Sequence, residues 1–375
     1  MEPTVGAWCG TSSVVFRLHD HDQRLSSVRL NCSVFADPAD FTYVAAARAW
    51  ELRLPRPAVH RIEYRLELVH ANGDREIVAD PDNPRRAGDS SVLWCVDYRE
   101  PDWLRLPQAQ GRWRDVYLPL HAVPGEMVAR VWSPATPTDR VVVAHDGPDF
   151  QRHGELGRYV AAMVGAGRIP PCHLVLLPPG ERFEWYSASP AYARALACDV
   201  LPKIAAELGA EPTPGAEPTR VGKQNATPGA EPTRGGKQNA TPITRPVVGV
   251  GASLGALAML HAQRRYPAGF AGLFLQSGSF FQPRYDRQES GFQRYLRIVR
   301  FTGRVLRSAD GPAVPVALTC GAVEENLANN RDMALVLRAQ GYAVSFAEVP
   351  DAHNWTGWRD ALDPHLTVLL QKVFA

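Results

Sequence analysis

The first hundred residues contain short segments in which every second position is hydrophobic. The clearest is 62–68, Ile-Glu-Tyr-Arg-Leu-Glu-Leu, where apolar and polar side chains alternate. This period-two spacing is typical of strands with one buried face, and such strands recurring between turn residues predict two packed sheets. The predicted strands are 14–18, 28–34, 50–54, 62–68 and 92–96. Residues 1–100 are therefore expected to form a β-sandwich domain.

Beyond residue 115 the pattern changes to fully apolar runs that alternate with helix-length segments. Alternation of buried strands with helices predicts βαβ units around a mostly parallel, doubly wound sheet. The expected strands are 140–145, 173–177, 246–250, 273–276, 314–319 and 342–349, with helices at 159–165, 191–208, 254–266, 327–340 and 358–373. We therefore expect an α/β domain over 116–375, joined to the sandwich by a linker over 101–115.

A tandem repeat interrupts the α/β pattern between a predicted helix and a predicted strand. Residues 215–228 and 229–242 are two copies of a 14-residue sequence that differ at one position, and a partial copy precedes them. The repeat is rich in Pro, Gly and polar residues and has no apolar period, so it cannot bury enough surface to become ordered. We expect a disordered insertion at about 209–242, and its removal is expected to leave fold and activity intact.

Composition narrows the class of protein. Apolar residues make up 45% of the 375 residues, which is typical of a folded protein with a large core. The formal charge is only +2 and no basic tract stands out, which argues against nucleic acid as a partner. No apolar run has the length of a membrane span or a secretion signal, so we expect a cytoplasmic protein without membrane insertion. The sequence predicts no oligomeric state.

The six cysteines, at positions 9, 32, 95, 172, 198 and 320, show no CxxC motif and no spacing typical of metal ligands. They are expected to be scattered, mostly buried thiols without a disulfide framework, and no metal site is predicted.

The strongest chemical motif lies at residues 251–255, Gly-Ala-Ser-Leu-Gly, between an apolar strand and a helix. A GxSxG motif at a strand-to-helix junction is typical of a nucleophile elbow, which lifts a serine hydroxyl above the carboxyl edge of the sheet. The motif therefore predicts Ser253 as a nucleophile. The N–H group of Leu254, at the start of the helix, is then expected to bind the developing oxyanion.

A nucleophilic serine needs a base, and the base needs an orienting acid. His353 lies on the loop between the last predicted strand and the last helix, at the same edge of the sheet as Ser253. His145 is a rival, although its place before Asp-Gly fits an oxyanion loop better. For the acid, Glu324 follows the turn after the strand at 314–319, whereas Glu325 could instead begin the next helix. Ser253, Glu324 and His353 come in the chain order of the α/β-hydrolases.

These motifs together resemble the enterochelin (catecholate siderophore) esterases, within the esterase D group of α/β-hydrolases. The matching pieces are Asp-Gly at 146–147, Arg-Phe-Glu-Trp at 182–185, the serine motif, Gly-Ala-Val-Glu at 321–324 and His-Asn-Trp at 353–355. The resemblance implies an α/β-hydrolase fold, a preceding immunoglobulin-like domain, and a triad of the matching serine, glutamate and histidine. It also implies hydrolysis of the ester (lactone) bonds of an iron-loaded catecholate siderophore, which releases iron inside the cell.

The chain departs from that family at two site motifs. Residues 351–354 read Asp-Ala-His-Asn where the family usually has Gly-Gly-His-Asp. Pro148 follows the Asp-Gly pair and has no N–H to donate, so the second oxyanion donor is expected to be Gly147, with Asp149 as the alternative.

For the substrate, the site motifs contribute aromatic side chains and a cation. Arg182, Trp185 and Trp355 are the predicted contacts for an aromatic, anionic ester. The leading hypothesis is thus a siderophore esterase that uses no metal or organic cofactor. The alternatives are a general carboxylesterase or acyltransferase of the same group, and a hydrolase-like binding protein with a dead site.

Overall fold

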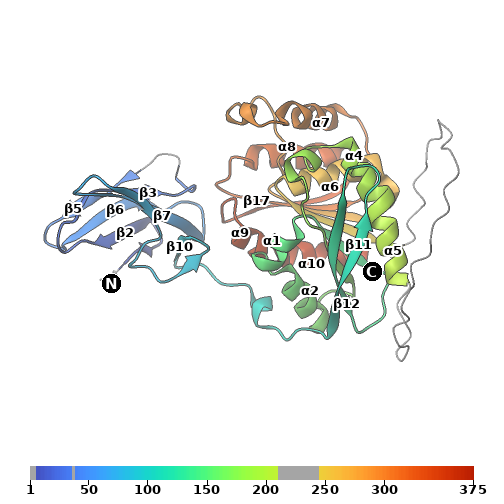
Figure 1. Ribbon diagram of the computed structural model, residues 1–375, viewed down its shortest axis with the longest axis horizontal. Helices are drawn as coiled ribbons and strands as arrows, with labels where there is room; N and C mark the ends of the chain where they lie inside the picture. The colour runs from blue at the N-terminus through green and yellow to red at the C-terminus, as the bar shows by residue number, and fades with distance from the viewer. Residues whose placement is uncertain (1–5, 36–38, 210–244) are drawn as a thin grey trace.

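The structure is a computed structural model that describes residues 6–35, 39–209 and 245–375. The N-terminal part, at the left of Figure 1, consists of two antiparallel sheets. One sheet has the order β1 (Trp8–Cys9), β2 (Ser13–His19), β6 (Ala49–Pro55), β5 (Thr42–Val44). The other has the order β4 (Ala39–Asp40), β3 (Leu25–Asn31), β7 (Arg61–His70), β10 (Ser90–Trp94), β9 (Arg86–Ala87), with β8 (Arg75–Val78) paired to β7. We call this part the front unit.

The two sheets share one apolar core. Alternate residues of β7, namely Ile62, Tyr64, Leu66 and Leu68, are buried, which confirms the period-two expectation for this segment. They pack with Val14, Phe16 and Leu18 of β2 from the other sheet.

The expectation that all six cysteines are free thiols is wrong. Cys9 of β1 and Cys95, just after β10, form a disulfide, and their Cα atoms lie 4.5 Å apart. The two residues are separated by 86 positions, and β1 and β10 belong to different sheets. Only the fold brings them together, so their spacing in the sequence gave no signal. Cys32, Cys172, Cys198 and Cys320 are free.

The segment that follows the front unit contains secondary structure and a buried aromatic residue. A short 3₁₀ helix η1 (Asp102–Arg105) carries Trp103, which is fully buried and packs edge-on against Tyr159 at 5.3 Å between ring centroids. The first strand of the large sheet already begins at Gly111, inside the segment predicted as a linker.

The remainder of the chain, which we call the catalytic half, is built on an eight-stranded sheet of order β11-β12-β14-β13-β15-β16-β17-β18. β12 is antiparallel to both of its neighbours, whereas all pairs from β14 to β18 are parallel. The strands are β11 (Gly111–Pro119), β12 (Glu126–Pro134), β13 (Val141–Ala144), β14 (His173–Leu176), β15 (Val247–Ala252), β16 (Gly272–Gln276), β17 (Pro315–Gly321) and β18 (Ala343–Val349). The predicted mostly parallel sheet is confirmed, and the antiparallel strand β12 makes it mixed.

Helices cover both faces of this sheet (Figure 1). One face packs against α4 (Pro190–Arg194), α5 (Leu201–Gly209), α6 (Leu254–Arg265), α7 (Tyr295–Arg307) and α8 (Leu327–Ala339). The other packs against α1 (Gly147–Arg152), α2 (Leu156–Gly165), α9 (Trp355–Asp360) and α10 (Leu362–Val373). A short helix α3 (Arg182–Trp185) lies in the loop after β14, and a π-helical segment η2 (Ala195–Val200) joins α4 to α5. The helices η3 (Pro267–Gly269) and η4 (Gln288–Gly291) are short 3₁₀ turns. Because both faces are covered, every residue of the central strands β13, β14, β15 and β16 is buried.

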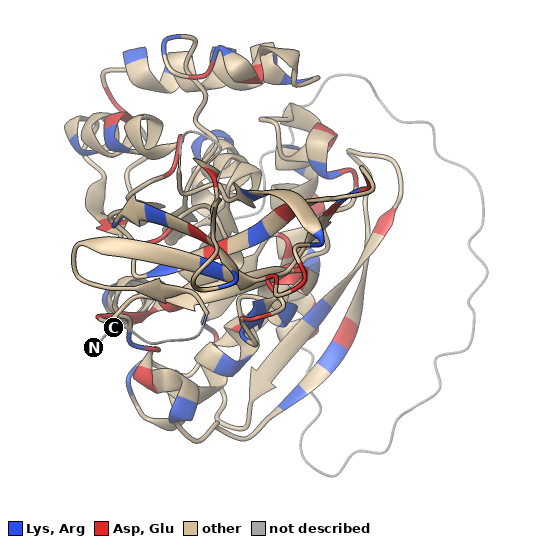
Figure 2. Cartoon of the chain, turned by 90° about the vertical axis from the view of Figure 1, so that its left-hand side faces the viewer, with Lys and Arg blue, Asp and Glu red and all other residues tan. Residues whose placement is uncertain are grey.

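Basic and acidic residues are interspersed over the face shown in Figure 2. Within the described ranges, none of the helices combines the length and apolarity that crossing a lipid bilayer requires. The tandem repeat lies outside the described residues.

Candidate active site

Ser253 occupies a sharp turn between β15, which ends at Ala252, and α6, which begins at Leu254. Its backbone has φ 55° and ψ −122°, a conformation that non-glycine residues rarely adopt and that is typical of a functional turn. The turn is so tight that a Cβ atom on Gly251 would lie 2.4 Å from the backbone of Gly255. The small residues of the GxSxG motif are therefore required by the approach of strand and helix.

Glu324 and His353 lie together at the carboxyl edge of the sheet. Glu324 follows β17, and His353 lies between β18 and α9. The Nδ1–H group of His353 donates to Glu324 Oε2 at 2.8 Å, and the Glu324 side chain is fully buried. With its proton on Nδ1, the imidazole has Nε2 free to act as an acceptor. Glu325, the alternative acid, is exposed.

The second oxygen of Glu324 is also held. Glu324 Oε1 accepts from the hydroxyl of Ser277 and from the N–H of Gly321, both at 2.6 Å. Ser277 in turn accepts from the indole N–H of Trp358 at 2.9 Å. The position of Ser277 just after β16, beside the nucleophile strand, was the only sequence signal for this role.

The hydroxyl of Ser253 lies 3.1 Å from that of Ser279, a residue the sequence did not single out. Within the described part of the chain, no hydrogen bond joins Ser253 Oγ to His353. Such contacts are often long in enzymes without substrate and shorten only in the reacting complex.

The prediction that Gly147 donates to an oxyanion is wrong for this structure. Its N–H donates to the carbonyl oxygen of Leu177 at 2.8 Å, and the N–H of the alternative, Asp149, donates to Asp146 at 3.0 Å. A Cβ atom on Gly147 would lie 2.6 Å from the backbone of Leu176, so the absence of a side chain here lets the ends of β13 and β14 approach each other closely. Leu254 is different, because it is the first residue of α6 and first-turn N–H groups have no partner within a helix.

Two of the three predicted substrate contacts have internal roles. Arg182 Nε and Nη2 donate to Oδ1 and Oδ2 of Asp146, at 2.8 and 2.9 Å, so its charge is balanced by a carboxylate within the protein. Trp185 is only 6% exposed and stacks on Tyr192 at 5.3 Å. Trp185 is thus part of the core, and a substrate contact by Arg182 stays a prediction.

Trp355, the third predicted contact, is half-buried near His353 and packs edge-on against Phe150 and Trp358. It remains a predicted substrate contact.

His145, the rival base, is completely enclosed. Its ring nitrogens bind the carbonyl oxygen of Gly255 at 3.0 Å and the hydroxyl of Tyr192 at 2.9 Å. Burial lowers the pKa of His145 to about 4, so the ring is neutral at pH 7. It has no free nitrogen for catalysis.

Comparison with solved structures identifies this architecture. A ferric enterobactin esterase from Salmonella typhimurium matches with a TM-score of 0.71 and 18% identity over 96% of this chain and 94% of that one. The enterobactin esterase from Shigella flexneri, determined in the presence of enterobactin, matches with a TM-score of 0.69 and 18% identity over the same shares. The chain has the fold of these esterases.

A ferulic acid esterase also matches, with a TM-score of 0.51 and 16% identity, over 71% of this chain and 100% of its own. No protein-family model matches the chain, and neither does the sequence of any curated protein.

The front unit borders the site directly. A pocket of about 190 Å³ is lined by Ala352, His353 and Asn354 on one side, and by residues of β3, β7 and β10 on the other. Arg65 of β7 is among the latter. Among the described residues, its side chain has no hydrogen-bond or ion-pair partner. The sequence placed no functional residue in the front unit, because an arginine on the polar positions of a strand looks like an ordinary surface residue.

Proposed function

We propose that the protein is a serine esterase in which Ser253 attacks the substrate carbonyl and His353 takes its proton. Glu324 accepts a hydrogen bond from the Nδ1–H group of His353, which fixes the tautomer and stabilises the imidazolium. The N–H group of Leu254 binds the oxyanion, and water then hydrolyses the acyl-enzyme. The observation that carries this proposal is the 2.8 Å bond between His353 and Glu324 at the sheet edge where Ser253 stands on its strained turn. The chemistry uses no metal or organic cofactor.

For the substrate we propose an ester (lactone) of a catecholate siderophore, whose cleavage releases bound iron. The matches support this choice through their extent. The two enterobactin esterases described above each match 96% of the chain, and thus both the front unit and the catalytic half, whereas the ferulic acid esterase matches 71% of the chain. We also propose that the front unit is an immunoglobulin-like domain and that it forms one wall of the substrate site.

Arg65 gives that wall a cation. Catecholate and carboxylate groups are anionic, and an arginine without an internal partner is available to bind them. Since Arg182 is neutralised by Asp146, Arg65 is the better candidate for this role.

The nucleophile is tested with Ser253→Ala. We expect ester hydrolysis and labelling by a fluorophosphonate probe to be abolished while the circular dichroism spectrum stays unchanged. Ser308→Ala, at the exposed end of α7, is the control and should leave both intact. Hydrolysis by Ser253→Ala at the wild-type rate would refute the assignment, and no labelling of the wild type would indicate a dead site.

The substrate class is tested on the wild type with a panel of a triscatecholate lactone, a feruloyl ester and simple aryl esters. A kcat/KM for the lactone well above the others supports the siderophore proposal. A preference for the simple esters would instead indicate a general carboxylesterase.

The role of Arg65 is tested with Arg65→Met. We expect KM for the catecholate ester to rise by about tenfold, the effect of losing roughly 1.4 kcal/mol of binding, with kcat and the KM of a neutral ester little changed. Arg29→Met, which removes an exposed cation of β3 paired with Asp40, is the matched control. Equal effects of the two variants would show that Arg65 contributes only general charge.

The compartment is a separate question. Disulfides are rare in the cytoplasm and persist in oxidising compartments. The Cys9–Cys95 disulfide therefore favours an oxidising compartment over the cytoplasm that the sequence predicts.

A further inference from the structure

Arg61, the first residue of β7, is a buried arginine at the junction of the front unit and the catalytic half. Its side chain is 2% exposed. One terminal nitrogen, Nη1, donates to Glu63 of the same strand at 2.8 Å. The other, Nη2, crosses to the catalytic half and donates to Asp351 Oδ2 at 3.0 Å and to Asn354 Oδ1 at 2.8 Å.

The two residues that Arg61 binds flank His353 in the chain. Asp351 Oδ1 accepts from the side-chain amide of Asn354 and from the N–H of Ala352, both at 2.8 Å. Asn354 Oδ1 also accepts from the N–H of Gly357 at 2.8 Å, and this bond caps the start of α9. Arg61, Asp351 and Asn354 thus form a closed ring of hydrogen bonds, and this ring holds the loop on both sides of His353.

The main chain reinforces this contact. The N–H of His60 donates to the carbonyl oxygen of Pro350 at 2.7 Å, directly beside the Arg61 contact. The front unit therefore binds both the backbone and the side chains of the loop that follows β18.

We infer that Arg61 is a positioning residue for catalysis: the front unit sets the placement of His353 by holding Asp351 and Asn354. The inference rests on the proposed esterase function. A planar guanidinium can bind two acceptors at fixed angles, which a lysine cannot reproduce. Small errors in the placement of a catalytic base reduce the rate strongly, whereas they affect substrate binding little.

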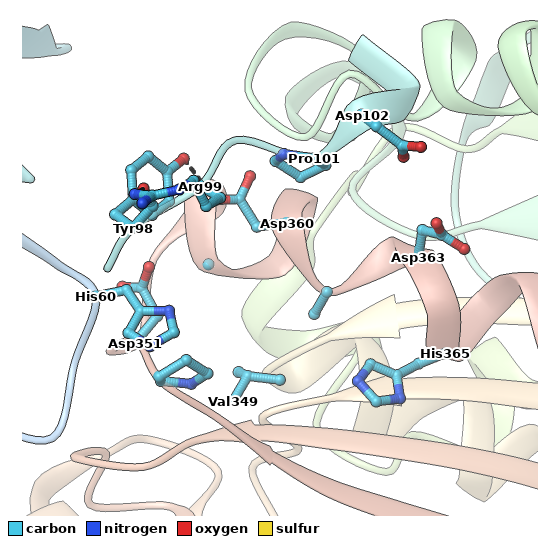
Figure 3. A pocket seen from close by; sticks show the side chains of 13 residues that line it. His60, Tyr98, Arg99, Pro101, Asp102, Val349, Asp351, Asp360, Asp363 and His365 are labelled. Atoms are coloured by element: carbon cyan, nitrogen blue, oxygen red, sulfur yellow. Dashed lines mark hydrogen bonds between the residues drawn. The ribbon is translucent and has the colours of Figure 1, made fainter. Parts of the chain in front are cut away.

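A second contact between the two units allows a matched control. The hydroxyl of Tyr98 donates to Asp360 at 2.8 Å. In Figure 3 this pair lines a cavity of about 300 Å³, and His60 and Asp351 line the same cavity. Tyr98→Phe therefore weakens the junction without touching the loop that carries His353.

The experiment measures kcat and KM for Arg61→Met, Arg61→Lys, Asp351→Asn and Tyr98→Phe in the full chain. We expect Arg61→Met to lower kcat by about 10²-fold with little change in KM, the loss typical of a misplaced catalytic group. Arg61→Lys should be intermediate, and Tyr98→Phe should keep the wild-type kcat. Equal losses in Arg61→Met and Tyr98→Phe would overturn the inference, because both would then report only weaker docking.

The double variant Arg61→Met/Asp351→Asn separates positioning from stability. It removes the buried carboxylate that Arg61→Met leaves without its cation, so its melting temperature should recover towards the wild type. We expect kcat to stay as low as in the worse single variant, since both changes break the same ring. Recovery of kcat along with the melting temperature would overturn the inference. If Arg61→Met does not fold, this variant and Arg61→Lys decide the question.

A measurement that does not depend on ester hydrolysis tests this inference separately from the proposed function. The Nδ1 proton that His353 shares with Glu324 should give a far-downfield proton NMR signal that Glu324→Gln removes. We expect Arg61→Met/Asp351→Asn to broaden or lose this signal while remaining folded. An unchanged signal would contradict the positioning role, even if the wild type hydrolyses none of the esters tested and the proposed function fails.

Discussion

His145 and His261, two buried histidines of the catalytic half, are held in the neutral form. His261 of α6 is 3% exposed and packs edge-on against Phe301 of α7 at 4.9 Å between ring centroids. Burial, with smaller contributions from Arg265, Arg304 and Arg297, lowers the pKa of His261 to about 3. Protonation of this ring in the folded protein is therefore strongly disfavoured at all but acidic pH.

The low pKa of His261 predicts a loss of stability in mild acid. The unfolded chain binds a proton on this residue below about pH 6.5, whereas the folded chain does so only near pH 3, so unfolding takes up a proton between these values. For each unit by which the pH is lowered within this window, the titration of His261 alone should reduce the free energy of unfolding by ~1.4 kcal/mol. In urea titrations at pH 7 and pH 5, His261→Leu should show a smaller pH difference than the wild type.

Met259→Leu is the control for this experiment, because it changes the packing of the same helix without removing a titrating group. It should keep the pH difference of the wild type. If His261→Leu keeps that difference too, His261 is not the group that destabilises the protein in acid.

Residues whose role follows from their position at a strand end could be predicted from the sequence. Ser253, Glu324 and His353 each follow a predicted strand, and the structure brings Glu324 and His353 into contact as expected. Ser277 could not be identified, because its φ of 48° and its hydroxyl contact with Glu324 are properties of the folded loop and leave no pattern in the sequence. The expectation for Gly147 failed for a related reason, since a backbone N–H has a partner or not depending on a neighbouring loop.

At the scale of elements, the Cys9–Cys95 disulfide links the two sheets of the front unit. Cys9 lies in β1 of the sheet that contains β2, and Cys95 follows β10 of the sheet that contains β7. Both sulfurs lie in the core that the sheets share. Two small sheets that bury a modest core gain most from such a link, because it restricts the unfolded chain.

Removing the disulfide with Cys9→Ala/Cys95→Ala should therefore destabilise the front unit. The loss of a native disulfide from a small domain typically costs about 2–5 kcal/mol. Hydrogen exchange followed by mass spectrometry should show lower protection in β2, β7 and β10 and smaller changes in β15 to β17. Cys198→Ala, which removes a partly exposed free thiol, is the control. Unchanged protection of β2 and β7 would contradict a stabilising role for the disulfide.

Elements with a clear apolar period were predictable, and those shaped by their neighbours were not. The alternation in β7 and the apolar runs of β13, β14 and β15 are found where the sequence placed them. β11 was missed because its polar positions outnumber its buried ones: it is the edge strand of the large sheet and pairs only with β12. η1 was missed because its anchor is the single buried ring of Trp103.

At the scale of the whole molecule, the sequence predicted two units but not how they meet. Arg61, Tyr98 and His60 occupy ordinary positions in the strands and turns of the front unit, and each contacts the catalytic half through one or two hydrogen bonds. These contacts join residues between 262 and 293 positions apart, and neither hydrophobic period nor motif spacing carries that information.

The pairing of Arg61 with Asp351 and Asn354 has a consequence for recombination between related enzymes. A chimera that joins this catalytic half to a foreign front unit would bury Asp351 against a surface that lacks its cation. A functional exchange of front units would have to transfer the arginine and its two acceptors as a set. In natural relatives these three positions are thus expected to change together, so that the two units evolve as one enzyme.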